Sequence, residues 1–388
     1  AMTRSIGTCN TMGTASTMTS IADAMGFTLP GASSIPAADC RHPQMAAQCG
    51  KTIVDMVWYD HKPSRWLTKK NFLNGIAAYM ALGGSTNAAI HLIAMANRAS
   101  ITLSLADMEE IARKIPVLAN LFPSGKGLMD DFFFAGGLMA QLKKISPFLH
   151  LDAKGVTNTQ VSAWIENADC YDDDTIRDLS NPVIPLSQGC ALTVLHGNLC
   201  PNGAVMKSSA ASSYLRHHVG PALVFDTHQQ LSEQIDSPEL NVTKDTVIIL
   251  RNAGPVGGPG MPEWGNLPIP KKLLQQGVTD MVRISDARMS GTHYGTCILH
   301  VAPEAAVGGP LALVQTGDLI ELNIEAGSLN MLVDDTELAQ RREALKPTHQ
   351  TFSRSWSALY QQHVTQADEG CDFDFLQSGS DVPEPPIF

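Results

Sequence analysis

Several widespread catalytic motifs are absent from this sequence of 388 residues. It contains no G-x-S-x-G and no S-x-x-K segment, so it lacks the local signatures of the common serine hydrolases. Its eight cysteines are scattered and form no C-x-x-C pair. A chain of this length without a clustered cysteine framework is typical of a reducing compartment, with thiols or metal ligands in place of structural disulfides.

Long apolar segments are absent as well. Residues 1–9 lack the apolar core of a signal peptide, and the apolar stretch at 77–96 is interrupted by "GGSTN" and by His91. That stretch therefore indicates a buried pair of helices and not a membrane span. We expect a cytoplasmic protein with no membrane partner.

Positive charge is scarce in this chain. Lys and Arg number 27 against 38 Asp and Glu, which gives a net charge of −11. A nucleic-acid partner is excluded, because its binding needs a basic face. A small anionic substrate remains compatible, since a few local cations or a metal ion outweigh the mean charge.

The hydrophobic fraction of 44% supports a sizeable core, and the length favours two domains. The first half shows helical periodicity, as in the segment from Thr68, a suitable N-cap, to the stop at Gly83–Gly84. After about Asn181, short β-branched segments alternate with Gly/Pro turns, which is typical of a barrel or sandwich.

The first candidate site is "SIGTCNTMGTAST", in which Cys9 precedes a predicted helix. The N-terminus of a helix favours the thiolate form of a cysteine. A free cysteine is equally often a small buried hydrophobic side chain. Spacing alone leaves both interpretations open.

The second candidate site is "RNAGPVGGPGMPEWG", where four glycines and three prolines precede Glu263. This stretch has no G-K-[ST] element, so it does not predict a nucleotide P-loop. Glycines let a backbone approach a ligand closely, and the carboxylate of Glu263 is a suitable oxygen ligand for Mg²⁺. A stiff surface loop with an exposed glutamate is the alternative.

The third candidate is Ser290 in "RISDARMSGTHYGTC", between two predicted strands. It is either a turn residue or a catalytic base or nucleophile. A serine hydroxyl is a very weak acid, so a catalytic role requires a neighbouring base or a cationic centre that stabilises the alkoxide.

Other residues give weaker signals. His91 suits a core histidine, the His217–His218 pair suits a solvated surface, and Asp130–Asp131 suits a metal or a helix N-terminus. Cys200 is expected in a turn beside Lys207, which is a further functional candidate.

Five segments taken together are more specific: "GTCNTMGTASTM", "GGSTNAAIHL", "GNLCPNGAVMKS", "GPVGGPGMPE" and "DARMSGTHYGTCILHVAPEAAVGGPLALVQTGD". In this order they resemble motifs of the iron–sulfur dehydratases of the dihydroxy-acid/phosphogluconate dehydratase (IlvD/Edd) family, from about Ser5 to about Leu345. "PEWGNLPIPKKLL", "ISDARMSGT" and "LMDDFFFAGGL" are more similar to the branch that dehydrates sugar acids, pentonates and hexonates such as arabinonate or xylonate.

The resemblance implies roles for four residues. Cys9 matches a cysteine that ligates an iron–sulfur cluster of the [2Fe-2S] type, and Glu263 matches a carboxylate on the catalytic Mg²⁺. Ser290 matches the serine that acts as general base, and Thr292 matches a hydroxyl that contacts the substrate. The implied reaction converts a 2,3-dihydroxy sugar acid to a 2-keto-3-deoxy acid with loss of water.

The resemblance also implies a fold of the α/β plus all-β class. Residues 1–180 would be the C-terminal, largely helical portion of an α/β cluster-binding domain, and residues 181–388 a β-barrel domain that carries the serine. Members of the family are dimers or tetramers, so we expect a homo-oligomer.

One departure from the family pattern concerns the remaining metal ligands. In the family, two further cluster cysteines and further Mg²⁺ ligands precede the motif of Cys9, whereas Cys40 and Cys49 follow it here. The chain thus resembles the C-terminal two-thirds of such an enzyme. We expect neither metal site to be complete in the isolated chain, which would leave it inactive or dependent on a separate chain.

Two alternatives share these motifs. A dihydroxy-acid dehydratase of branched-chain amino-acid biosynthesis would have the same site residues and a different pocket. A non-catalytic chain that binds a sugar acid or another subunit would retain the fold without turnover.

Overall fold

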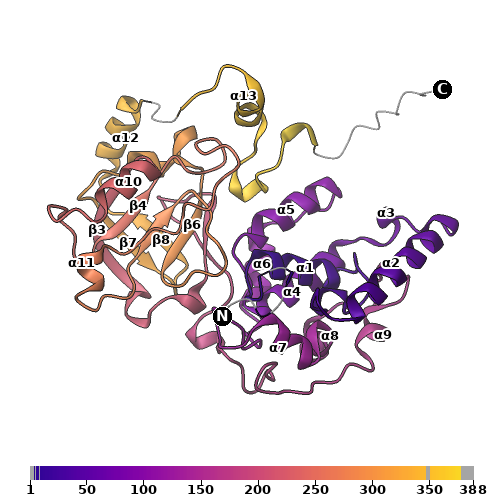
Figure 1. Ribbon diagram of the computed structural model, residues 1–388. Coiled ribbons are helices and arrows are strands. Elements are labelled where there is room, and N and C mark those ends of the chain that lie inside the picture. Colours follow the sequence, from indigo (N-terminus) through magenta and orange to yellow (C-terminus); the bar gives the residue numbers. More distant parts are fainter. Residues whose placement is uncertain (1–3, 5, 8, 347–349, 377–388) are drawn as a thin grey trace, which may run out of the picture.

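Helices dominate the first half of the chain in the computed structural model, which describes residues 4, 6–7, 9–346 and 350–376 (Figure 1). The helices of this half are α1 Thr14–Ala24, α2 Arg41–Trp58, α3 Pro63–Trp66, α4 Lys69–Leu82, α5 Ala88–Arg98, α6 Leu105–Ala112, α7 Met129–Phe134, α8 Gly137–Lys144 and α9 Val161–Ile165. None of the helices in the described residues is long and apolar enough to cross a membrane.

Helix α4 lies at the centre of this half, because almost all of its residues are buried. It begins as predicted at Thr68, which forms a capping box with Asn71, and ends at Gly83 in the left-handed conformation (φ 63°). Helix α5 starts later than expected: its N-cap is Asn87, not Ser85 or Thr86. The turn 83–87 is therefore free to contact the second half of the molecule.

Eight strands form one sheet in the described part of the second half: β1 Thr193–Leu195, β2 Gly203–Met206, β3 His217–Phe225, β4 Val247–Leu250, β5 Arg283–Ser285, β6 Cys297–Ala302, β7 Leu319–Asn323 and β8 Ser328–Met331. Their order is β1-β2-β6-β5-β4-β3-β7-β8. The backbone N–H of His196 donates to the carbonyl of Gly327, and the N–H of Leu329 donates to the carbonyl of His196. These two bonds join the edges of the sheet, so the sheet is nearly closed.

The expectation of an all-β second half is wrong in one respect. Strands β3, β4, β5 and β6 pair in parallel, whereas the other pairs are antiparallel. Parallel neighbours need crossover connections, and two short helices lie in these connections: α10 His228–Gln234 and α11 Lys271–Leu274. This half is therefore a mixed α/β unit around a nearly closed sheet.

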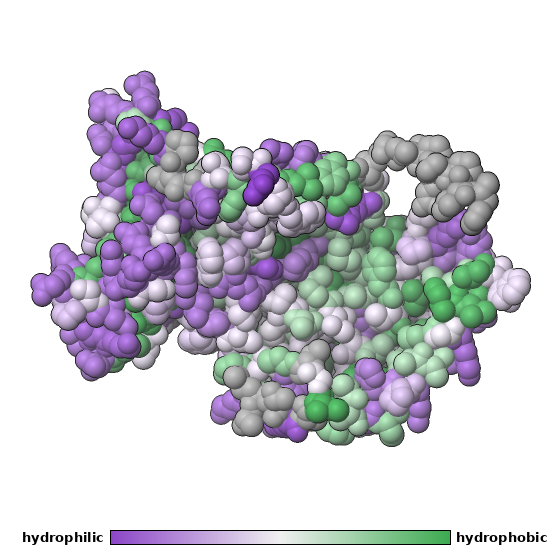
Figure 2. All heavy atoms as spheres, turned by 45° about the horizontal axis from the view of Figure 1, so that its top comes forward, coloured by the Kyte–Doolittle hydropathy of each residue, from purple (hydrophilic) through white to green (hydrophobic). Residues whose placement is uncertain are grey.

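The two halves lie side by side in Figure 1. In Figure 2, hydrophilic side chains predominate on the left, over the second half, whereas apolar side chains gather on the right. The C-terminal helices α12 Asp335–Ala344 and α13 Ser355–His363 belong to the second half. The segment after α13 returns to the first half, where Asp372 forms a bidentate ion pair with Arg98.

Candidate active site between the two halves

Ser290 lies on the loop between β5 and β6, as predicted. Asp286 anchors the start of this loop, because its buried carboxylate accepts three backbone N–H bonds. The donors are Asn252 (3.1 Å), Ala253 (2.9 Å) and Ala305 (3.0 Å). Burial, together with the nearby carboxylate of Glu304, raises the pKa of Asp286. The serine loop is thereby tied to the beginning of the glycine-rich loop that leads to Glu263.

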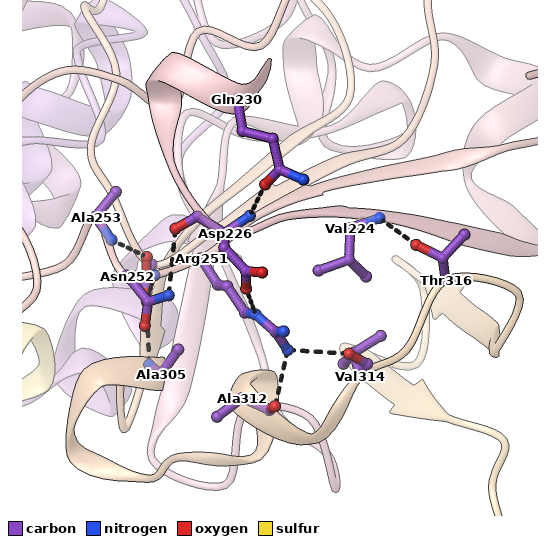
Figure 3. A network of polar contacts seen from close by, with 11 residues as sticks. Val224, Asp226, Gln230, Arg251, Asn252, Ala253, Ala305, Ala312, Val314 and Thr316 are labelled. Carbon is purple, nitrogen blue, oxygen red and sulfur yellow. Dashed lines mark hydrogen bonds and ion pairs between the residues drawn. The ribbon is translucent and has the colours of Figure 1, made fainter. Parts of the chain in front are cut away.

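The glycine-rich loop is fixed at its origin by Arg251, which directly follows β4 (Figure 3). Its guanidinium donates to the carboxylate of Asp226 and to the carbonyls of Ala312 and Val314, at 2.5–3.0 Å. Farther along, a Cβ at Gly254 would lie 2.7 Å from Oε2 of Glu304. A glycine is needed there, because the carboxylate of Glu304 approaches the backbone closely.

Asn87 of the first half contacts Glu263 directly. Its Nδ2 donates to Oε1 of Glu263 at 2.7 Å and to Oγ1 of Thr14 at 3.0 Å. Thr14, the first residue of α1, also bonds Oγ of Ser85 at 2.9 Å. Asn87 therefore links the carboxylate of the second half to Thr14 of α1, and Thr14 in turn contacts the turn before α5.

The serine loop packs against the same turn. A Cβ at Gly291 would lie 2.5 Å from Cβ of Ser85, so the two backbones approach closely only because residue 291 is glycine. Oγ of Ser290 lies 3.0 Å from Oγ1 of Thr292, and a Cβ added at Gly13 would lie 3.3 Å from the methyl group of Thr292. The structure thus brings Glu263, Ser290 and Thr292 to one interface between the halves.

Lys207 lies on the inner side of this interface. It directly follows β2, is 8% exposed, and donates from Nζ to the carbonyl of Gly83 at 2.5 Å. Burial lowers its pKa from 10.5 to about 8. A cavity of about 10 Å³ lies beside it and is lined by Ser85, Thr86, Lys207, Ser290 and His293, among others.

Cys9 lies on an exposed loop four residues before Gly13, the N-cap of α1. The expected effect of the helix N-terminus is not supported by this position, because a helix dipole acts within the first turn. Sγ of Cys9 is 3.1 Å from Oγ1 of Thr11, and the next residue, Asn10, donates to Asp130 at 2.8 Å. The loop of Cys9 is thereby held to the start of α7.

The described residues suit the expected Mg²⁺ ion better than the expected iron–sulfur cluster. Magnesium commonly uses one or two carboxylates with water and substrate oxygens. Glu263 supplies a carboxylate and is exposed, as the alternative of a surface loop expected. Asn87, whose Nδ2 contacts this carboxylate, has a buried Oδ1 with no hydrogen-bond partner among the described residues. This pair suits a hard cation.

An iron–sulfur cluster requires several thiolate ligands. Within residues 9–346 and 350–376, no three His, Cys, Asp or Glu side chains are grouped as a metal site. The described residues therefore do not form a complete cluster site around Cys9.

Several weaker candidates have structural roles. Asp130 and Asp131 lie in the first turn of α7, in agreement with one of their two predicted roles. Cys200 is a buried turn residue whose burial raises its thiol pKa to about 12. The idea of a solvated His217–His218 pair is half wrong, because His218 is buried and its Nε2 contacts the carbonyl of Asp245.

Sequence reasoning missed Asn87, Ser85 and Thr14 as site residues. By itself the turn "GGSTN" predicts a helix stop followed by a helix cap. The sequence held one further signal of a site. Three consecutive polar residues, Ser85 to Asn87, precede α5, although a helix needs only one N-cap residue. His91, expected in the core, is partly exposed, and burial lowers its pKa.

Comparison with known proteins identifies related sequences for both halves. The family models described as the dihydroxy-acid/6-phosphogluconate dehydratase N-terminal and C-terminal domains match residues 1–164 and 174–371. The chain is 69% identical over 387 residues to a 6-deoxy-6-sulfo-D-gluconate dehydratase of Pseudomonas putida. It is 46% identical over 379 residues to an L-arabinonate dehydratase of Rhizobium leguminosarum bv. trifolii.

A dihydroxy-acid dehydratase of Ignicoccus hospitalis is 41% identical over 367 residues. These matches cover 100%, 97% and 94% of this chain, and 67%, 65% and 65% of the respective relatives. The chain therefore spans about two thirds of the length of the relatives that it matches.

Proposed function

Because the chain belongs to the dihydroxy-acid/6-phosphogluconate dehydratase family, we propose that the site between its halves dehydrates a sugar acid. The product is a 2-keto-3-deoxy acid. The observation that carries this proposal is the junction of Asn87 with Glu263, beside Ser290 and Thr292. It joins a hard-cation site to a candidate base at one interface.

Sugar acids are favoured over branched dihydroxy acids by the pattern of relatives. The relatives named for sugar-acid substrates are 69%, 47% and 46% identical, whereas the dihydroxy-acid dehydratases are 37–41% identical. The relative at 69% identity is named for 6-deoxy-6-sulfo-D-gluconate. We take this six-carbon aldonate with a terminal sulfonate as the first candidate substrate.

Glu263 and Asn87 would hold Mg²⁺ through their side-chain oxygens. When bound, a magnesium ion draws electron density from the substrate carboxylate and 2-hydroxyl and so acidifies the C2 hydrogen. Ser290 takes the C2 proton, and Thr292, 3.0 Å from its oxygen, orients the hydroxyl and contacts substrate. Loss of hydroxide from C3 gives an enol, which tautomerises to the 2-keto acid.

Cys9 is proposed as one ligand of an iron–sulfur cluster of the [2Fe-2S] type. The remaining ligands would have to come from outside the described residues, since these residues contain no grouped set of ligands. No step of the proton transfer described above depends on this ligand. A cytoplasmic location and a homo-oligomeric state remain part of the same proposal.

The experiment is a substrate panel. The protein, together with a segment or chain that supplies the remaining cluster ligands, is treated anaerobically with iron, sulfide and Mg²⁺ and incubated with 6-deoxy-6-sulfo-D-gluconate, L-arabinonate and 2,3-dihydroxyisovalerate. Formation of 2-keto-3-deoxy acid from either sugar acid, with little from dihydroxyisovalerate, is expected. Turnover of dihydroxyisovalerate alone would contradict the proposed substrate class. Calorimetric binding of a sugar acid without turnover would instead indicate the non-catalytic alternative.

A further inference from the structure

Lys207 is a buried amine that the proposed reaction does not use. Its side chain is 8% exposed, and Nζ donates to the carbonyl of Gly83. Among the described residues, the one cause that shifts its pKa is loss of solvation, which lowers it to about 8. At mildly alkaline pH, near 8 and above, much of this side chain is therefore a neutral amine with a free lone pair.

The fold places this amine beside the serine loop. Strand β2 pairs antiparallel with β6, and Met206 is opposite Ile298, so Lys207 lies near the point where the serine loop enters β6. Lys207 and Ser290 line the same cavity of about 10 Å³. This volume is close to what one water molecule requires.

The cavity offers polar partners for such a water. Ser85 and Thr86 form part of its wall, and Nδ1 of His293 is a buried atom with no hydrogen-bond partner among the described residues. A water needs two to four polar partners to be held in a protein interior. Lys207, Ser290 and His293 together meet this requirement.

We propose that Lys207 is the positioning residue that accepts the hydroxyl proton of Ser290, across one water in this cavity. This role of Lys207 rests on the proposed function, and it adds the group that activates the serine. Serine–lysine pairs are an established way to activate a hydroxyl that is otherwise too weakly acidic.

The proton balance closes over one turnover. The O–H bond of Ser290 breaks and its proton reaches Nζ of Lys207, which gives an alkoxide and an ammonium. The alkoxide then takes the C2 proton of the sugar acid, and hydroxide leaves C3 with the electron pair of the C–O bond. The ammonium returns one proton through solvent to that hydroxide, so that water is released and both side chains regain their starting state.

The surroundings of Lys207 favour the neutral form. The titratable groups in the cavity wall are His293 and Cys297, and the latter is a buried thiol with a raised pKa. Behind Gly295, the buried Asp280–Arg283 ion pair (3.3 Å) has no net charge. Thus no unpaired carboxylate among the residues of the cavity wall raises the pKa of Lys207 back toward its ordinary value.

The first test does not depend on activity. The protein with ¹³C,¹⁵N-labelled lysine is titrated by NMR from pH 6 to 11, and the Lys207 signal is assigned by its loss in Lys207→Arg. A midpoint near 8 is expected, whereas an ordinary lysine titrates near about 10.4. A Lys207 midpoint above pH 10 would overturn the inference.

The second test separates proton transfer from support of the fold. In the substrate panel described above, Lys207→Met and Lys207→Arg should each lower kcat by about 100-fold or more, with KM within about threefold, by loss of base assistance. The rise of kcat with pH near 8 should disappear in both variants. Arginine can still donate to the carbonyl of Gly83 but stays charged.

Each result has a distinct meaning. Restoration of kcat by Lys207→Arg would show a structural contact only and would overturn the inference. Absence of turnover by the unaltered protein on every sugar acid would contradict the proposed function, and the NMR midpoint would still decide the state of Lys207. Thermal melting of both variants verifies that they fold.

Discussion

Nδ2 of Asn87 lies 2.7 Å from Oε1 of Glu263, although the two residues are 176 positions apart in the chain. This hydrogen bond crosses between the helical half and the half built on the sheet. The hydrogen bond uses the amide nitrogen of Asn87, and its amide oxygen Oδ1 is buried with no hydrogen-bond partner among the described residues. The relationship makes the two halves one site, and it leads to the first prediction.

Substitution of Asn87 by alanine should weaken Mg²⁺ binding by about 10- to 100-fold or more, because it removes a proposed ligand that also orients Glu263, and loss of an orienting group alone typically costs that much. The dissociation constant is measured by calorimetry with Mg²⁺ alone. Asn97→Ala on the same helix is the matched control, since Asn97 contacts the carbonyl of Glu369 instead. Equal Mg²⁺ affinity of Asn87→Ala and the unaltered protein would contradict a cation site at this junction.

We expect turnover to depend on the hydroxyl group of Thr292 and not on the shape of its side chain. Thr292→Val removes the group 3.0 Å from Oγ of Ser290, so kcat/KM for the sugar acid should fall by about 10-fold or more, in line with loss of a partly buried hydrogen bond. Thr292→Ser keeps the hydroxyl and should stay within about threefold. Similar rates for both variants would show that the hydroxyl has no role.

Gly291→Ala should destabilise the protein by about 1–3 kcal/mol, because the new methyl group would meet Ser85 at 2.5 Å. Urea unfolding gives the free energy of unfolding. Gly50→Ala is the control: Gly50 is inside α2, and a methyl group there would meet no atom of the described residues within 4 Å. The control should be neutral or stabilising by up to about 1 kcal/mol. Equal behaviour of the two variants would refute the close packing at Ser85.

The depressed pKa of Lys207 predicts a pH-dependent stability. Its pKa is about 8 in the folded protein and 10.5 for an ordinary lysine, so the folded state binds fewer protons between these values. The free energy of unfolding is therefore highest above pH 10.5, where Lys207 is neutral in both the folded and the unfolded state. It falls as the pH is lowered from 10.5 and has lost this contribution once the pH has passed through 8. Relative to the unaltered protein, Lys207→Met should therefore gain on the order of 3 kcal/mol between pH 10.5 and 8.

Denaturant unfolding at several pH values measures this difference. Below pH 8 the difference between Lys207→Met and the unaltered protein should become constant. A difference that does not change between pH 8 and 10.5 would show that the burial of Lys207 does not shift its protonation.

Local patterns of the sequence predicted much of the fold. Seven of the eight strands fall within the β-branched segments expected after about Asn181, because such segments between Gly/Pro turns are a local signal. Strand β3 begins earlier than expected, at His217 in place of Pro221, and so includes the histidine pair that was predicted to be solvated. The parallel pairing was not predictable in the same way. Helices α10 and α11 are short and each buries one leucine, Leu231 or Leu273, so they lack a clear helical period.

The site was predicted from one side only. Ser290 and Glu263 were found through their segments and through resemblance, whereas Asn87, Ser85 and Thr14 meet them only after folding. Contacts between residues so far apart in the sequence produce no local pattern from which they could be predicted. The domain boundary expected at 180/181 stays a prediction; it lies between α9 and β1.

The most direct measurement follows the C2 proton. A sugar acid with deuterium at C2, such as 6-deoxy-6-sulfo-D-gluconate, is incubated with the protein and with Ser290→Ala, and the product is analysed by mass spectrometry. The protein should release the C2 deuterium and form a 2-keto-3-deoxy acid, and Ser290→Ala should do so about 10³-fold more slowly with similar KM. Turnover of the deuterated sugar acid by Ser290→Ala at the rate of the unaltered protein would contradict the assignment of this interface as the catalytic site.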